Sequence, residues 1–233
     1  MVDFEVWDKL LRQYVDQEGR VNYAAWKTEQ PQVLDQWLSS QTTSFLKPNI
    51  NTLEKLALWI NLYNALTISS ILKRYPLDSI VPKILGVPNW LAFVWFFQHR
   101  SYYVFGQHYS LAQIEHQFLR NELPESRIHF AIVCASVGCP LLRSGAYFPE
   151  QVMQQLDKDA YRFINNPQKV YYDFDSQTLY CNKIFKWYRQ DFLKVASSIP
   201  EYIHSYLKID VPLTAATPIS YLDYDWSLNH RIS

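Results

Sequence analysis

Glycine is scarce in this sequence, which has 5 glycines in 233 residues. No GxGxxG or GxxxxGK[ST] motif occurs, so a Gly-rich loop that binds phosphate is excluded as a major feature. An excess of charge of one sign is missing too, because 22 basic residues balance 22 acidic ones. The composition therefore indicates neither nucleic acid nor an anionic membrane surface as a partner.

Cysteine is rare as well. Three cysteines in a chain of this length do not make a disulfide framework. The stretch MVDFEVWDKLL has acidic residues where a signal peptide carries basic ones, and it lacks a long apolar core. We therefore expect a cytoplasmic protein whose thiols stay reduced.

The two most apolar stretches lack the features of a membrane span. Residues 51–75 contain Asn61 and Asn64, and each of these amides would need a partner in lipid. Residues 84–97 are too few to cross a bilayer and include Pro88. This second stretch is expected to be a core segment or the wall of a hydrophobic groove.

Apolar residues are abundant, at 48% of the chain, and aromatic residues make up 16%. A chain of this size and composition is expected to form one domain over residues 1–233, with residues 1–49 as a helical extension packed on residues 50–230. The next elements follow from periodicity, caps and turn signals. Helices are expected at 2–15, 32–38, 51–75, 111–123, 149–165, 182–194 and 199–207, hairpins at 101–111 and 170–181, and a strand at 127–134.

These elements predict an α+β fold, mainly helical, in which a long buried central helix is accompanied by a small and mainly antiparallel sheet. Ser110 and Gln113 form a capping box, so the helix that follows carries Glu115 and His116. The first hairpin is expected to turn at Gly106–Gln107 in a type II′ turn.

The stretch HFAIVCASVGCPLL, residues 129–142, contains the strongest candidate for chemistry. Cys134 ends the expected strand and precedes a loop of small residues, a common place for a nucleophile because loop amides can bind an oxyanion. Side chains alternate along a strand, so His129 would point away from Cys134. The alternative is that Cys134 is a buried core thiol.

His116 is the expected proton acceptor for Cys134, with Glu115 as an electrostatic or substrate-orienting group. Asn61, Asn64 or Asp225 would orient the imidazole. The alternatives are structural: Glu115 would pair with a nearby arginine, and the two amides would tie their helix to a loop.

Two other readings of the same residues stay open. Cys134 and Cys139 have a C-x4-C spacing that permits a redox dithiol, although it is not the C-x-x-C spacing that lowers a thiol pKa. Glu115, His116, His129 and a cysteine would be the ligands of a metal site, yet no HExxH or paired CxxC motif is present. We expect no metal and no cofactor.

Several motifs together resemble the DUF547 family (domain of unknown function 547). They occur in the family's order at residues 58–66, 110–120, 127–147, 182–192 and 221–229. The resemblance implies no settled activity. It does imply that Cys134 matters more than Cys139, because plant relatives can have serine at the position of Cys139.

Three functions are therefore expected as alternatives. The first is a cysteine-nucleophile enzyme of the acyl-transfer class, hydrolase-like or transpeptidase-like, acting on an amide, thioester or γ-glutamyl-type bond of an unidentified small molecule or peptide. The second is a non-catalytic binding or scaffold module with a protein partner. The third is a thiol-redox protein that uses Cys134 and Cys139.

Overall fold

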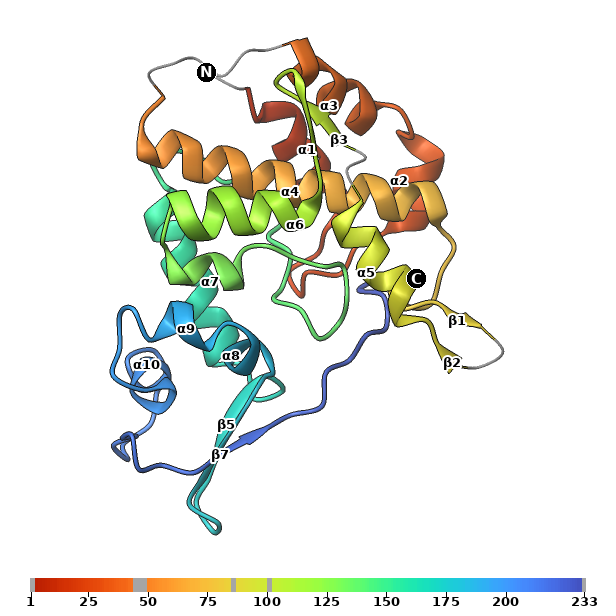
Figure 1. Cartoon of the computed structure of the whole chain (residues 1–233). Helices are drawn as coiled ribbons and strands as arrows, with labels where there is room; N and C mark the ends of the chain where they lie inside the picture. The colour runs from red at the N-terminus through yellow and green to blue at the C-terminus, as the bar shows by residue number, and fades with distance from the viewer. Residues whose placement is uncertain (1–2, 44–49, 85–86, 100–101, 232–233) are drawn as a thin grey trace.

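The computed structural model describes residues 3–43, 50–84, 87–99 and 102–231. Its helices surround one long helix, and its strands form small sheets at the periphery (Figure 1). The helices are α1 (Glu5–Tyr14), α2 (Tyr23–Glu29), α3 (Val33–Thr43), α4 (Thr52–Arg74), α5 (Trp90–Gln98), α6 (Leu111–Gln113), the π-helix η1 (Ile114–Glu122), the 3-10 helix η2 (Ser126–Phe130), α7 (Val152–Ile164), α8 (Ile184–Trp187), α9 (Arg189–Phe192) and α10 (Ile199–His204).

The strands pair over short distances. They are β1 (Lys83–Ile84), β2 (Val87–Pro88), β3 (Tyr102–Val104), β4 (Gln107–Tyr109), β5 (Val170–Asp173), β6 (Thr178–Cys181) and β7 (Ile219–Tyr221). Three antiparallel pairs join β1 to β2, β3 to β4 and β5 to β6, and β7 adds to β6 in parallel. The predicted α+β class with a small, mainly antiparallel sheet is confirmed.

Helix α4 is the centre of the molecule, as its sequence predicts. Asn51 and Glu54 form a capping box at its start, and it ends just before Pro76, which cannot continue a helix. Helices α2 and α3 contact it on one side, and η1 and α7 contact it as well (Figure 1). The N-terminal helices thus share one hydrophobic core with the rest of the described chain. None of the described helices combines the length and the apolar character that a membrane crossing requires.

The prediction of a strand at residues 127–134 is wrong. Residues 126–130 form η2, in which the Glu125 side chain accepts a hydrogen bond from the Arg127 amide, and the chain then continues without regular structure. The Asn64 side chain binds the carbonyl of Ala131 and the amide of Val133, groups that a strand would offer to a neighbouring strand. A short apolar run is compatible with any buried segment, so periodicity alone could not exclude this conformation.

Smaller differences concern turns and helix breaks. The first hairpin turns one residue earlier than expected, at Phe105 and Gly106, whose φ angles of 49° and 78° fit a type I′ turn rather than type II′. The helix expected at 182–194 is divided into α8 and α9, and α2 is an additional helix.

The C-terminal tail returns across the loop that follows Cys134. Gly138 donates its amide to the carbonyl of Asp225 at 2.7 Å, and Val137 donates to Ser227 at 2.8 Å. Asn229 donates in turn to the carbonyl of Ala135 at 3.0 Å. The tail therefore fixes the backbone of residues 135–138.

Replacing Gly138 with alanine is expected to destabilise the fold by about 1–3 kcal/mol, the usual cost of overpacking. A Cβ atom there would lie 2.7 Å from the Tyr224 ring and 2.8 Å from the Asp225 carbonyl oxygen. Urea unfolding of the two proteins measures the difference. The matched control is Gly145→Ala, whose Cβ would first meet the Asp8 side chain at 3.1 Å. Equal losses in both variants would contradict tight packing of the tail on Gly138.

Candidate functional site

A pocket with a cavity volume of about 620 Å³ brings together most of the residues expected from the sequence. Glu115, His116, His129, Cys134 and Cys139 all contribute to its wall. The rest of the wall is largely aromatic and comes from α4, α5, α8, the residue between α8 and α9, and the tail: Tyr63, Trp90, Phe93, Phe97, Trp187, Tyr188, Tyr224 and Trp226. An apolar cavity with a few convergent polar groups is the usual form of a small-molecule site.

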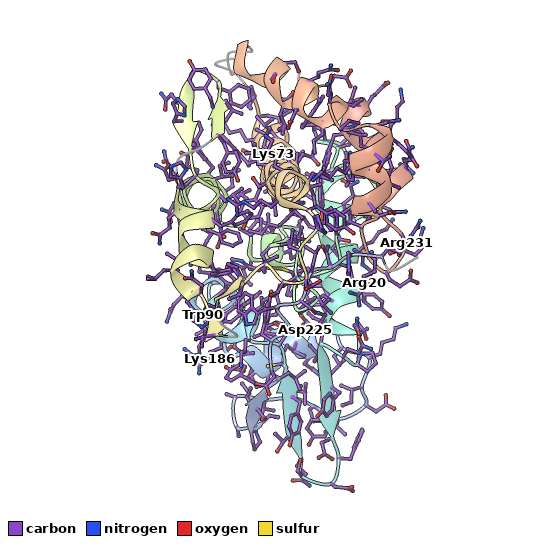
Figure 2. The ribbon with its side chains drawn as sticks, turned by 90° about the vertical axis from the view of Figure 1, so that its right-hand side faces the viewer. Arg20, Lys73, Trp90, Lys186, Asp225 and Arg231 are labelled. Atoms are coloured by element: carbon purple, nitrogen blue, oxygen red, sulfur yellow. A yellow bond between two sulfur atoms is a disulfide. The ribbon has the colours of Figure 1, made fainter. Side chains whose placement is uncertain are left out.

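Helix α5 supplies one wall of this pocket. The described residues of α5 therefore agree with the prediction that residues 84–97 include the wall of a hydrophobic groove. Trp90 stands at the start of α5 and is 47% exposed (Figure 2). Its ring meets Trp226 edge-on at 5.3 Å, and Phe93 meets Trp226 at 5.0 Å. The tail and α5 therefore close the pocket with aromatic rings.

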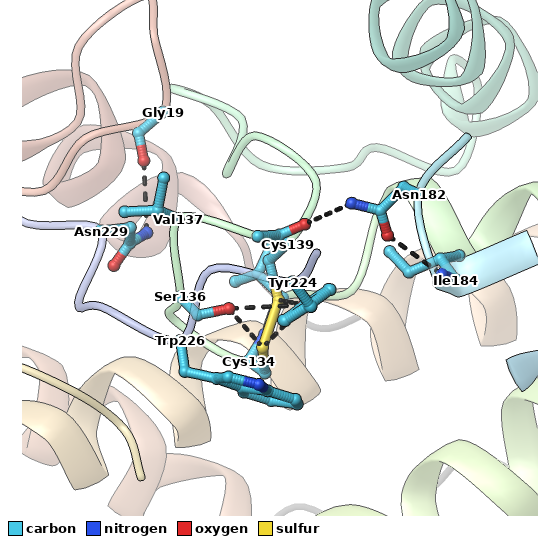
Figure 3. The surroundings of a disulfide bond; sticks show 12 residues. Gly19, Cys134, Ser136, Val137, Cys139, Asn182, Ile184, Tyr224, Trp226 and Asn229 are labelled. Carbon is cyan, nitrogen blue, oxygen red and sulfur yellow. Dashed lines mark hydrogen bonds between the residues drawn. A yellow bond between two sulfur atoms is a disulfide. The ribbon is translucent and has the colours of Figure 1, made fainter. Parts of the chain in front are cut away.

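Cys134 and Cys139 form a disulfide with a Cα–Cα distance of 6.3 Å. Cys139 is buried, and its sulfur accepts hydrogen bonds from the Cys134 amide at 2.9 Å and the Tyr224 hydroxyl at 3.2 Å. Cys134 is half-buried, its sulfur lies 3.1 Å from the Ser136 hydroxyl, and Trp226 lies alongside it (Figure 3). The Cys134–Cys139 pairing is thus present in this structure, so the expectation that the thiols stay reduced is wrong for these two cysteines.

The backbone of the loop after Cys134 is strained, and the C-terminal tail already binds two of its amides. Ala135 has a φ of 65°, a left-handed conformation that costs a non-glycine residue about 1–3 kcal/mol and is typical of functional sites. The amides of Val137 and Gly138 are bound by the tail, so these two amides are not available to an oxyanion. The third cysteine, Cys181, is unpaired, and burial raises its pKa to about 12.

His116 lies on the π-helix η1 and is exposed. Its Nδ1 atom is 2.8 Å from Nη1 of Arg120. A guanidinium can only donate, so Nδ1 is the acceptor and the neutral ring carries its proton on Nε2. His116 therefore has no lone pair to offer unless the contact with Arg120 breaks.

Glu115 is buried, and its carboxylate acts on the Tyr188 hydroxyl electrostatically. Burial and this carboxylate raise the pKa of Tyr188 well above its usual value. Neither nearby arginine forms the ion pair that one alternative assigned to Glu115, because Arg120 binds Asp191 and Arg127 binds Glu125.

His129 and Asp191 form a buried pair that sequence reasoning missed. Nε2 of His129 is 2.9 Å from Oδ2 of Asp191, and the imidazole stacks on the Tyr188 ring at 3.8 Å. Burial lowers the pKa of His129, and the hydrogen bond to Asp191 opposes that effect. The hydrogen bonds from His129, Arg120 and Lys194 hold the pKa of Asp191 well below its usual range.

Asn61 and Asn64 bind the main chain on both sides of the cysteine loop. Asn61 donates to the Tyr147 carbonyl at 2.7 Å and accepts from the Tyr147 amide at 3.0 Å. Asn64 donates to the Ala131 carbonyl at 2.9 Å and accepts from the Val133 amide at 3.0 Å. Each amide donates one hydrogen bond to the backbone and accepts one from it, so the two side chains position the main chain rather than a histidine.

Asp225 is not among the residues that line this pocket. Its carboxylate accepts hydrogen bonds from the amide and hydroxyl of Ser227. Asp225, labelled in Figure 2, lines a second hollow instead. The structure does not bring it to His116. Within the described ranges, no group of three His, Cys, Asp or Glu side chains is arranged to hold a metal ion.

Comparison with known families gives one match. The model of the family described as "Protein of unknown function, DUF547" matches residues 48–164, which is just over half of the chain. The matched region contains α4, η1 and the loop from Cys134 to Cys139, whereas Asp191 and the tail lie beyond it. No curated protein and no solved structure matches the chain.

Proposed function

The chain belongs to the DUF547 family, and from the chemistry of its pocket we propose that it is a cysteine-nucleophile enzyme of the acyl-transfer class. The observation that carries the proposal is the position of Cys134, half-buried in the wall of a pocket that also contains two histidines. The left-handed Ala135 directly after it supports the assignment, because such strain persists where function requires it.

The disulfide makes Cys134 a latent nucleophile. A dithiol reductant breaks the Cys134–Cys139 bond, gives two thiols, and is itself oxidised to a disulfide. The Cys134 thiol then loses its proton to a histidine and attacks the carbonyl carbon of an amide, thioester or γ-glutamyl-type substrate. The leaving amine or thiol takes that proton, and water or an amine acceptor releases the acyl group from the thioester. A cytoplasmic location would provide the reductant.

The test is alkylation of the reduced protein. After reduction with a dithiol, iodoacetamide should label Cys134 selectively at a pH well below 8, because an activated thiol ionises below the usual value of about 8.5. Mass spectrometry identifies the labelled residue, and Cys134→Ala should lose the label. Cys181 is an internal control, since its burial should keep it unlabelled in the folded protein. A Cys134 that reacts no faster than a free thiol would rule out the enzyme and favour a non-catalytic binding module.

A second candidate is thiol–disulfide exchange, which the Cys134–Cys139 bond itself favours. The variant Cys139→Ser distinguishes the two functions. It removes the disulfide and must abolish turnover of a dithiol–disulfide couple, whereas turnover of a thioester substrate, which needs Cys134 alone, should persist.

A further inference from the structure

We propose that His129, oriented by Asp191, is the group that accepts the proton of Cys134, and that His116 is not. This inference rests on the proposed function and identifies the base of the same site. The sequence favoured His116, because a regular strand would have turned His129 away from Cys134. That strand is absent, and both His129 and Cys134 contribute to the wall of the pocket.

The unpartnered atom of His129 supports the proposal. Its side chain is fully buried, and Nδ1 has no hydrogen-bond partner although Nε2 is bound to Asp191. Most buried polar atoms are paired, so an unpaired one requires an explanation. Because a carboxylate accepts hydrogen bonds, Asp191 places the proton of the neutral ring on Nε2 and leaves the lone pair on Nδ1. A histidine in the wall of the pocket therefore has a free lone pair on Nδ1 that can receive a proton.

Asp191 is a positioning residue in this arrangement. It fixes the tautomer of His129 and would stabilise the imidazolium formed by proton transfer, as a buried carboxylate does behind a catalytic histidine. Arg120 at 2.6 Å and Lys194 at 2.9 Å keep Asp191 ionised. Arg120 thus supports His129 through Asp191, whereas it occupies the lone pair of His116 directly.

The charges around His129 define how it titrates. Glu115 favours the imidazolium and Arg120 disfavours it, both from η1, while Tyr188 packs on its face and Asp191 holds Nε2. Burial keeps the ring neutral at pH 7 while the cysteines are bonded, since it lowers the pKa below the ordinary value. After reduction, transfer of the thiol proton to Nδ1 produces a thiolate and an imidazolium. The proton later passes from Nδ1 to the leaving amine or thiol.

The experiment is the pH dependence of iodoacetamide alkylation at Cys134 in the reduced full-length protein. His129→Gln should move the midpoint up toward about 8.5, the value of an ordinary thiol, and lower the rate at pH 6.5 by about tenfold or more. Asp191→Asn should raise the midpoint by a smaller amount. His116→Gln should shift it less than Asp191→Asn does. His204→Gln, a histidine in α10 away from the pocket, should leave it unchanged.

The outcomes separate the two proposals. A raised midpoint in His116→Gln with none in His129→Gln would overturn the assignment of His129 and leave the enzyme intact. A wild-type midpoint already near 8.5, the same in every variant, would instead overturn the proposed function. If His129→Gln does not fold, nitrogen NMR of histidine-labelled protein decides. His129 should be an imidazolium at pH 7 in the reduced wild type and neutral in reduced Cys134→Ala, and a neutral ring in both would contradict the proposal.

Discussion

Replacing Asn64 with aspartate is expected to destabilise the protein by about 3–5 kcal/mol at pH 7, the cost of an unpaired buried charge. The Asn64 amide donates to the Ala131 carbonyl at 2.9 Å, and an aspartate would present an oxygen to that carbonyl instead. The neighbouring contact with the Val133 amide would survive, because it needs only an acceptor. The substitution is nearly isosteric, so the loss measures the missing donor and the added charge rather than a cavity.

The pH dependence of this variant follows from the same argument. Burial away from cations should raise the pKa of the new carboxyl in the folded state above its unfolded value of about 3.9. The folded form then binds more protons than the unfolded form, so the stability difference from wild type should shrink as the pH falls toward 4. Urea unfolding at pH 7 and at pH 4.5 measures both effects.

The matched control is Asn166→Asp. Asn166 is half-buried and uses only its side-chain oxygen, which accepts from the Gln168 amide. Aspartate preserves that contact, so its cost should stay within about 0.5 kcal/mol, as for most surface changes. Equal losses at positions 64 and 166 would contradict the role assigned to the Asn64 donor. Because Ala131 lies three residues before Cys134, loss of the Asn64–Ala131 contact should also alter the alkylation rate of Cys134.

Much of the fold could be predicted from short-range signals. Residues 51–75 predict a buried helix that begins with a capping box at Asn51 and ends before Pro76, and both signals are local. The capping box at Ser110 likewise predicts the start of α6, which continues into η1 with Glu115 and His116. What the sequence could not reveal is that this helix continues with π geometry, which has no comparable local signal.

The candidate site depends on contacts between distant residues, and these were only partly predictable. Cys134 stood out because it follows an apolar run and precedes small residues. Its partner at position 139 lies nearby in sequence, but spacing alone could not decide between a dithiol and a free thiol at Cys134. Asp191 lies 62 residues after His129, and only the packing of α9 against η2 makes them a pair. No periodicity relates two such residues, so the pair had to come from the structure.

The segment after Cys139, which includes Arg143 and Tyr147, is held in place by a second buried polar group, Asp159 of α7. Asp159 is 3% exposed and accepts hydrogen bonds from the Tyr147 hydroxyl at 2.7 Å and from Arg162 at 3.2 Å. Arg143 lies 3.5 Å from the same carboxylate. Burial raises the pKa of Asp159, while the two arginines act in the opposite direction. Because Asn61 binds the backbone of Tyr147, α4 and α7 hold this segment together.

Replacing Asp159 with asparagine is therefore expected to cost about 3–5 kcal/mol of folding free energy, since it leaves two partly buried arginines without their shared counter-charge. The control Asp157→Asn lies two residues away on α7, where an exposed carboxylate contacts Arg127 at 3.3 Å, and it should cost at most about 1 kcal/mol. Tyr147→Phe should cost about 1 kcal/mol, because it removes one hydrogen bond and no charge. Urea unfolding of the three variants tests the ranking. If Asp159→Asn costs no more than Tyr147→Phe, the arginines do not depend on Asp159, and the ordering of the segment after Cys139 must come from Asn61 instead.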